Sequence, residues 1–177
     1  MRTITSIIQT VLILSALALI SVDDLQAQCK QEGSSVVCLD ARFQFLSPTS
    51  VRMEFAPGGD FTDAPTVMVQ KREFKPVQIE VWADKEWLVV KTSKLFLRYK
   101  AKSGRFTKDN LSLTFKGEKK PFWTPADSDP SNLGGISTSL DGLRKDRMPK
   151  DETGILNRSG VTVLDDSRSP VWDPTTE

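Results

Sequence analysis

The chain has 177 residues, of which 38% are hydrophobic and 27% charged, a composition typical of a globular protein rather than a disordered one. Lys and Arg number 24 against 23 Asp and Glu, so the large basic excess of general nucleic-acid binders is missing. Histidine is absent, which excludes Ser-His-Asp and Cys-His catalysis and removes the commonest metal ligand. We therefore expect no nucleic-acid partner, no metal and no cofactor.

The N-terminal segment, residues 1–27, has the pattern of a secretory signal peptide. A short positive start precedes the apolar stretch Ile4–Val22, predicted to be a signal helix, and the segment ends on a small residue at a plausible cleavage point. The expected mature chain is exported to the periplasm or the medium and begins near Gln28. An uncleaved membrane anchor is the alternative, because the apolar stretch is close to the minimum for a bilayer span. A lipid anchor on Cys29 is disfavoured by the Gln that precedes it.

Cys29 and Cys38 are the only two cysteines, and they lie close together in the sequence. In an exported protein such a pair favours a disulfide, with free thiols as the alternative. The bridge would stabilise the chain by about 2–3 kcal/mol on the loop-entropy estimate. Two thiols without histidines are too few ligands for a metal site.

Residues 28–118 alternate between short β-prone runs and turn signals, which predicts a domain of antiparallel strands. The predicted strands are Val36–Phe45, Val51–Phe55, Thr66–Val69, Val77–Trp82, Trp87–Thr92, Leu95–Lys100 and Leu111–Phe115. Pro57–Asp60 is a strong turn signal, and Ala83–Glu86 is predicted to connect a hairpin. No segment after the signal peptide shows a helical apolar stripe. We expect an all-β fold, an antiparallel β-sandwich or a partly open barrel.

Residues 119–177 change character and are predicted to form a long irregular linker. This region is rich in Pro, Gly and charged residues, and only Val161–Asp165 is predicted to be a strand. Loops of this length in a compact protein usually serve a binding site or a partner surface.

Ordered motifs in this C-terminal region carry a family resemblance. They are Asn132–Gly135, Leu140–Gly142, Gly154–Gly160 and Val163–Ser167. In this order and spacing they resemble the segment of glycoside hydrolase family 31 that joins an N-terminal β-sandwich to a catalytic (β/α)8 barrel. Three upstream stretches are similar to the opening strands of that sandwich, which is of the galactose-mutarotase-like type: Phe45–Phe55, Asp63–Thr66 and Trp87–Leu95.

The resemblance implies an exo-acting, retaining α-glycosidase that acts on an α-linked glucoside or xyloside oligosaccharide. Its two catalytic aspartates would lie on a barrel beyond Glu177, so no catalytic residue is expected within this chain. Retention needs two carboxylates about 5–5.5 Å apart. Asp165 and Asp166 would point to opposite faces of a strand. Asp127 and Asp129 lie in a Pro-rich loop without apolar neighbours to raise the pKa of a proton donor.

By position in the resembled segment, Arg158 and Asp166 are the candidates for binding sugar hydroxyl groups. Alternatively, Asn132, Arg158 and Asp165 hold the linker against the barrel. The family usually places an aromatic residue after the Arg-x-Gly step, where this chain has Val161, so no sugar-stacking ring is expected there.

Tryptophan offers another route to a sugar, because its ring can stack on the apolar face of a pyranose. The four tryptophans, Trp82, Trp87, Trp123 and Trp172, could form such a platform, with packing at the core or the sheet edge as the alternative. Trp82 and Trp87 flank the predicted hairpin, where they are expected to be exposed.

Three functions therefore follow from the sequence. The first is a non-catalytic N-terminal domain that shapes or supports the sugar pocket of an α-glycoside hydrolase, with the catalytic barrel as its partner. The second is a self-sufficient exported carbohydrate-binding β module. The third is a β-sandwich that binds a protein through its sheet edge. After signal cleavage, none of the three involves a membrane.

Overall fold

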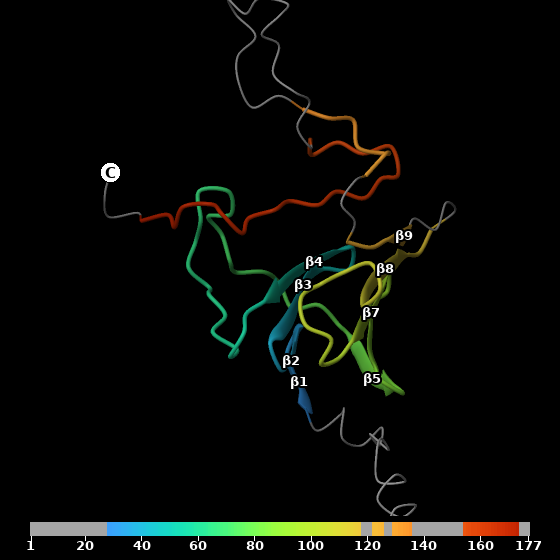
Figure 1. Cartoon of the computed structure of the whole chain (residues 1–177). Helices are drawn as coiled ribbons and strands as arrows, with labels where there is room; N and C mark the ends of the chain where they lie inside the picture. The colour runs from blue at the N-terminus through green and yellow to red at the C-terminus, as the bar shows by residue number, and fades with distance from the viewer. Residues whose placement is uncertain (1–27, 118–121, 126–128, 136–153, 174–177) are drawn as a thin grey trace, which may run out of the picture.

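A computed structural model describes residues 28–117, 122–125, 129–135 and 154–173 (Figure 1). Its regular elements are strands: β1 (Cys29–Glu32), β2 (Ser35–Cys38), β3 (Ala41–Ser47), β4 (Ser50–Phe55), β5 (Glu80–Asp84), β6 (Trp87–Lys91), β7 (Leu95–Lys100), β8 (Leu111–Phe115) and β9 (Phe122–Trp123). Within these residues no element is a helix, and hence none is a helix long and apolar enough to cross a bilayer. The predicted signal peptide lies outside the described residues.

The strands form two sheets, each an antiparallel meander in chain order. The first, here the N-terminal sheet, has the order β1-β2-β3-β4, and the second, the C-terminal sheet, has the order β5-β6-β7-β8-β9. Figure 1 shows them as two neighbouring layers. Every strand pair is antiparallel, so the predicted all-β, antiparallel architecture is confirmed.

One hydrophobic core joins the two sheets. Its buried members come from alternate positions of both: Val36, Cys38, Ala41, Phe43, Phe45, Leu88, Val90, Leu95, Leu97, Tyr99, Leu111 and Leu113. The alternation follows from the period-two geometry of a strand, which sends every second side chain to the same face. At its centre, the ring of Phe43 lies 5.2 Å from that of Tyr99, and Phe106 packs on both at 5.6 Å. These aromatic contacts tie the N-terminal sheet to the C-terminal one.

The prediction of a single strand over Val36–Phe45 was wrong. The chain turns after β2 and returns as β3, with Cys38 paired to Ala41. Leu39, at the turn, has a left-handed backbone with φ of 55°. A leucine is rare in this conformation, so the apolar sequence concealed the turn. The tight connection between β5 and β6 was predicted correctly, and Lys85 supplies its left-handed residue with φ of 57°.

Three further boundaries differ from the predictions. Thr66–Val69 forms no strand, because Thr66 makes only an isolated bridge, to Val171. Val161–Asp165 pairs with no strand within the described part of the chain, although Val161 is buried. Conversely, Phe122–Trp123 lies in a predicted loop but adds to the edge of β8. A ladder requires a partner strand at hydrogen-bonding distance, and local β propensity does not supply one.

The last difference concerns the start of β5. The predicted strand Val77–Trp82 is paired only from Glu80 and continues to Asp84. Val77, Ile79 and Val81 nevertheless pack against the core, as their alternation predicts.

Candidate functional site

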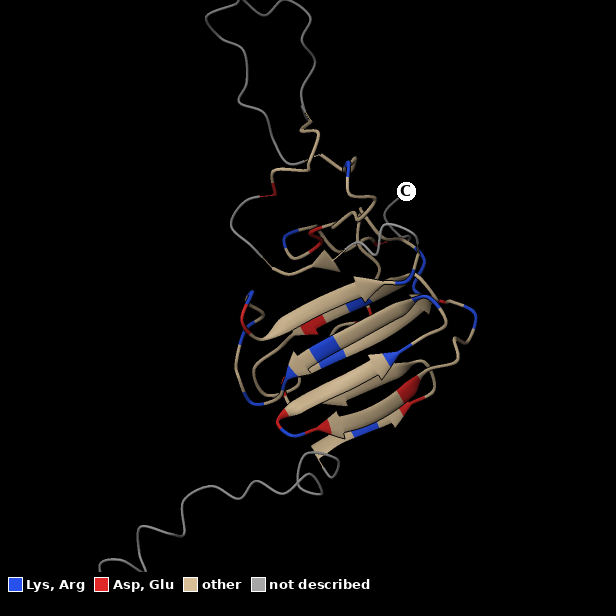
Figure 2. Ribbon diagram, turned by 90° about the vertical axis from the view of Figure 1, so that its right-hand side faces the viewer, with Lys and Arg blue, Asp and Glu red and all other residues tan. Residues whose placement is uncertain are grey.

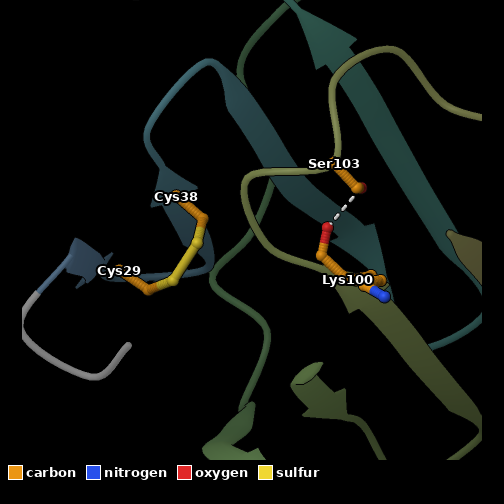
Figure 3. Close-up of a disulfide and its surroundings, with 4 residues drawn as sticks. All are labelled: Cys29, Cys38, Lys100 and Ser103. Atoms are coloured by element: carbon orange, nitrogen blue, oxygen red, sulfur yellow. Dashed lines mark hydrogen bonds between the residues drawn. A yellow bond between two sulfur atoms is a disulfide. The ribbon is translucent and has the colours of Figure 1, made fainter. Parts of the chain in front are cut away.

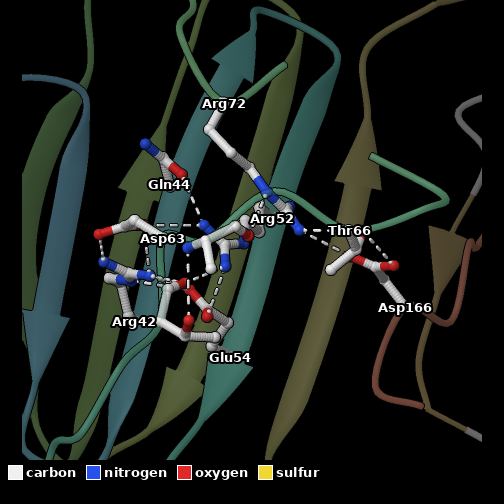
Figure 4. A network of polar contacts seen from close by, with 10 residues as sticks. Arg42, Gln44, Arg52, Glu54, Asp63, Thr66, Arg72 and Asp166 are labelled. Carbon is white, nitrogen blue, oxygen red and sulfur yellow. Dashed lines mark hydrogen bonds and ion pairs between the residues drawn. The ribbon is translucent and has the colours of Figure 1, made fainter. Parts of the chain in front are cut away.

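Asp166 anchors the C-terminal segment, defined here as residues 154–173, to the loop that follows β4. Its Oδ2 lies 2.8 Å from Nη2 of Arg72, and the hydroxyl of Thr66 donates to both carboxylate oxygens at 2.8 and 3.0 Å. The side chains of Arg72 and Asp166 are only 14% and 22% exposed. Figure 4 shows the three side chains meeting between strands and loop. We call Thr66, Arg72 and Asp166 the Asp166 anchor.

The charge of Asp166 is stabilised by this arrangement. Burial acts to raise the pKa of Asp166, but hydrogen bonds from Arg72, Thr66 and Ser169 and the positive charge of Arg72 outweigh it, so the pKa lies below its usual value. Two backbone bonds flank the anchor: Val67 N donates to the carbonyl of Pro170, and Trp172 N donates to the carbonyl of Pro65. The carboxylate of Asp166 is thus bound by residues of this chain, and its contact with sugar hydroxyl groups stays a prediction.

The other site residues predicted from the sequence have contacts of their own, away from the Asp166 anchor. Arg158 has an exposed side chain, and its backbone N–H donates to the carbonyl of Ser131 at 2.9 Å. Asp165 is exposed and accepts a hydrogen bond from the backbone of Ser167 at 3.0 Å. Hydrogen bonds from Ser167 also hold the pKa of Asp165 below its usual value. No hydrogen bond or ion pair among the described residues links Arg158 to Asp166.

Asn132 joins two remote stretches of the linker. Its side-chain amide donates to the carbonyl of Gly154 at 2.7 Å, and its side-chain oxygen accepts from the N–H groups of Gly134 and Gly154 at 2.8 and 2.9 Å. Asn157, which forms an isolated bridge with Asn132, donates to Asp129 at 2.5 Å. This cluster, the Asn132 clasp, holds residues 129–135 against residues 154–160. The contacts of Asn132 join two stretches of the linker to each other, and the expected contact with a barrel stays a prediction.

The Asn132 clasp depends on glycine for a steric reason. A Cβ added to Gly154 would overlap the carbonyl group of Gly134, and one added to Gly135 would lie 3.2 Å from the Cα of Gly154. Because backbone atoms face one another here, no side chain can move aside to make room. The glycines of the family-like motifs thus serve the close approach of two chain segments.

Two arginines and two carboxylates form a second network, on the outer face of β3 and β4 (Figure 4). Arg42 lies 2.6 Å from Glu54 and 2.8 Å from Asp63, and Arg52 lies 2.7 Å from Glu54 and 3.0 Å from Asp63. Both guanidinium groups also donate to the carbonyl of Thr62, at 3.1 and 2.5 Å. The network ties the loop after β4 to the N-terminal sheet, and the same loop carries Thr66 and Arg72.

Asp63 is the loop-side acid of this network. Hydrogen bonds from Arg42 lower the pKa of Asp63 most; burial opposes them, and the charge of Arg42 and contacts with Arg52 add to the lowering. The network was not predicted from the sequence, although Arg52 and Glu54 alternate with apolar residues along the predicted strand Val51–Phe55. The network depends on the pairing of Arg42 with Glu54 across β3 and β4. This pairing can be predicted only when the turn before β3 is recognised.

Cys29 and Cys38, which we expected to pair, are joined by a disulfide that links β1 to β2 (Figure 3). Cys38 also lines a pocket of about 300 Å³, whose other lining residues are Leu39, Asp40, Phe55, Tyr99, Lys102 and Gly104. Burial, opposed by a hydrogen bond with Ser103 and aided by the charge of Asp40, raises the pKa of Tyr99. Its hydroxyl donates to the carbonyl of Gly104 at 3.2 Å.

Neither this pocket nor the Asp166 anchor brings together the paired acids of a retaining glycosidase. Retaining hydrolysis uses a carboxylate nucleophile and a carboxylic acid across one opening. The pocket has a single acid, Asp40, and the carboxylate of Asp166 is held charged by Arg72. Within the residues that the structure covers, no three Cys, Asp or Glu side chains cluster as a metal site would require. Asp127, one of the acids considered above, lies outside the described residues.

Comparison with known proteins finds no family model that matches the sequence and no curated protein that is significantly similar to it.

Proposed function

We propose that the chain is a non-catalytic β-sandwich domain of the galactose-mutarotase-like type, which supports the catalytic barrel of an exported α-glycosidase of the glycoside hydrolase family 31 type. The proposal rests on the ordered motifs between Asn132 and Ser167 and on how this region is built. Its described C-terminal part is bound to the loop after β4, and its described residues present apolar side chains outward.

The outward apolar side chains are the observation that carries the proposal. They are Leu133, Ile155, Leu156, Val163, Leu164 and Val171, which are 46–67% exposed. Clusters of exposed apolar residues usually mark a surface that another body covers. The Asn132 clasp and the Asp166 anchor hold their backbone in place without a strand or helix. An irregular backbone that is held by such contacts and carries exposed apolar side chains suits docking onto a second domain.

In this proposal, the two residues that the sequence offers for sugar binding have separate roles. Asp166 is an anchoring residue, because its carboxylate is engaged by Arg72 and Thr66. Arg158 is exposed on the same segment and is available to a sugar or to the barrel. The disulfide between Cys29 and Cys38 is compatible with the proposed export, since such bonds persist in oxidising compartments. N-terminal sequencing of the exported product is expected to begin near Gln28.

Two experiments test the proposal. The purified chain is expected to release no p-nitrophenol from α-glucoside, α-xyloside or α-galactoside substrates above a buffer control. Co-expression with a family 31 barrel that lacks its own sandwich is expected to give a complex with restored α-glycosidase activity. Ile155→Glu is expected to weaken the complex, whereas Leu39→Glu, at an exposed apolar residue between β2 and β3, is the matched control. Hydrolysis by the chain alone, or equal effects of the two substitutions, would contradict the proposal.

A further inference from the structure

The outer face of the C-terminal sheet carries a second apolar cluster, separate from the core. Leu88 and Val90 point into the core, so Val89 between them points outward. Val89 is nevertheless only 1% exposed. Its cross-strand partners are Trp82 on β5 and Arg98 on β7. An outward valine is buried here because large side chains lie beside it on both neighbouring strands.

Aromatic rings make up much of this cover. The rings of Trp82 and Phe96 lie 5.9 Å apart, and the guanidinium of Arg98 lies 4.8 Å from the centre of the Trp87 ring. Trp82 is still 37% exposed. On the edge strand β9, Phe122 pairs with Thr114 and so faces the same side, and it is 63% exposed. It lies two strands beyond Phe96, about 10 Å across the sheet.

Charged side chains surround the rings in pairs of opposite sign. Lys91 lies 2.8 Å from Glu80, and Arg98 lies 3.6 Å from Asp84. Lys100 and Glu86 form a third pair at 3.0 Å. Figure 2 views the molecule from this side and shows the blue and red positions interspersed over the strands. The charges of these three pairs balance, and their exposed atoms offer both donors and acceptors.

We infer that this face, built around Trp82 and Phe96 and extended by Phe122, binds an uncharged pyranose oligosaccharide. A pyranose ring presents an apolar face that stacks on an aromatic ring and a rim of hydroxyl groups that hydrogen-bond to charged side chains. Each cation of the three pairs lies beside an anion, which suits a ligand without charge. Trp82 is the stacking residue, and Glu80 and Lys91 are the hydroxyl-binding pair beside it.

This inference goes beyond the proposed support of a catalytic barrel and uses none of its apolar docking residues. Glycan binding by the sheet face would not require a barrel, and Ile155→Glu is expected to leave it unchanged. The two proposals can therefore fail separately.

Binding is tested by calorimetric titration of the disulfide-intact chain with maltoheptaose, cellohexaose and xylohexaose. We expect at least one of them to bind, with affinity independent of salt because the ligand is neutral. Trp82→Ala is expected to weaken binding about tenfold or more, as the loss of one aromatic anchor usually does. Phe74→Ala is the matched control, since Phe74 is 43% exposed but lies outside both sheets.

Two further variants guard against loss of folding. Trp82→Phe keeps a ring over Val89 and is expected to retain part of the affinity, and Phe122→Ala tests the other edge of the face. Absence of binding to all three oligosaccharides at millimolar concentration would overturn the inference. It would also be overturned by an unchanged affinity of both Trp82→Ala and Phe122→Ala, or by binding only to a charged polymer such as polygalacturonate or to a protein.

Discussion

Replacing Asp166 by Asn removes one charge from the Asp166 anchor while keeping the shape of the side chain. The change leaves the guanidinium of Arg72, 14% exposed, without the carboxylate that lies 2.8 Å away. The hydroxyl of Thr66 can still donate to the amide oxygen that replaces a carboxylate oxygen. The perturbation therefore isolates the charged part of the contact between the C-terminal segment and the loop after β4.

The expected size follows from the burial of the pair. Fully exposed ion pairs contribute about 0.2–1 kcal/mol, and breaking a buried pair costs about 3–5 kcal/mol. With side chains that are 14% and 22% exposed, the pair lies between these cases, and we expect Asp166→Asn to cost about 1–2 kcal/mol. In a double-mutant cycle with Arg72→Met, the coupling energy should be about 1 kcal/mol or more.

The hydrogen-exchange rates of two backbone amides measure directly how much the attachment of the C-terminal segment is weakened. Val67 N and Trp172 N donate across the junction, to Pro170 and Pro65, and become free when the segment detaches. Their exchange should accelerate about tenfold in Asp166→Asn, which corresponds to about 1.4 kcal/mol. Asp165→Asn is the control, because the side chain of Asp165 is exposed. Equal exchange rates in the two variants would refute our account of the anchor.

Three other perturbations test separate parts of the structure. Gly154→Ala should cost about 1–3 kcal/mol of the docking free energy of the C-terminal segment, because its Cβ would overlap the carbonyl of Gly134; unchanged protection of the segment from proteolysis would contradict this. Reducing the bond between Cys29 and Cys38 should lower the free energy of unfolding by about 2–3 kcal/mol, measured by urea denaturation with and without reductant. The pKa of Asp63 is lower in the folded protein than in the unfolded chain. The contribution of Asp63 to the free energy of unfolding is therefore present above the unfolded pKa of about 3.9 and is lost as the pH falls through the folded pKa. Urea denaturation should therefore show a smaller acid-induced loss of stability in Asp63→Asn, by about 1 kcal/mol or less because Asp63 is 63% exposed, and an identical pH profile would argue against the network.

The alternation of apolar and polar residues along the predicted strands accounts for most of what was predicted correctly about the fold. Leu95, Leu97 and Tyr99 occupy alternate positions of the predicted strand Leu95–Lys100, and all three are buried in the core. The tight turn at Lys85 was also found, because charged residues interrupt two apolar runs there. The turn after β2 was missed, because Leu39 is an apolar residue in a left-handed conformation. Local pattern locates strands well when their ends carry polar or glycine signals, and poorly when they do not.

The sequence by itself determined the all-β class, the alternating core and the pair of cysteines available for a bridge, because these depend on residue type and period. Only the tertiary structure decided that Asp166 binds Arg72 and Thr66, about a hundred positions earlier in the chain. Such contacts depend on which loops the two sheets bring together. No local sequence pattern encodes the distance in space between residues that lie far apart in the chain. The same reason applies to Val89, which is buried on an outward face because Trp82 and Arg98 occupy the neighbouring strands in register.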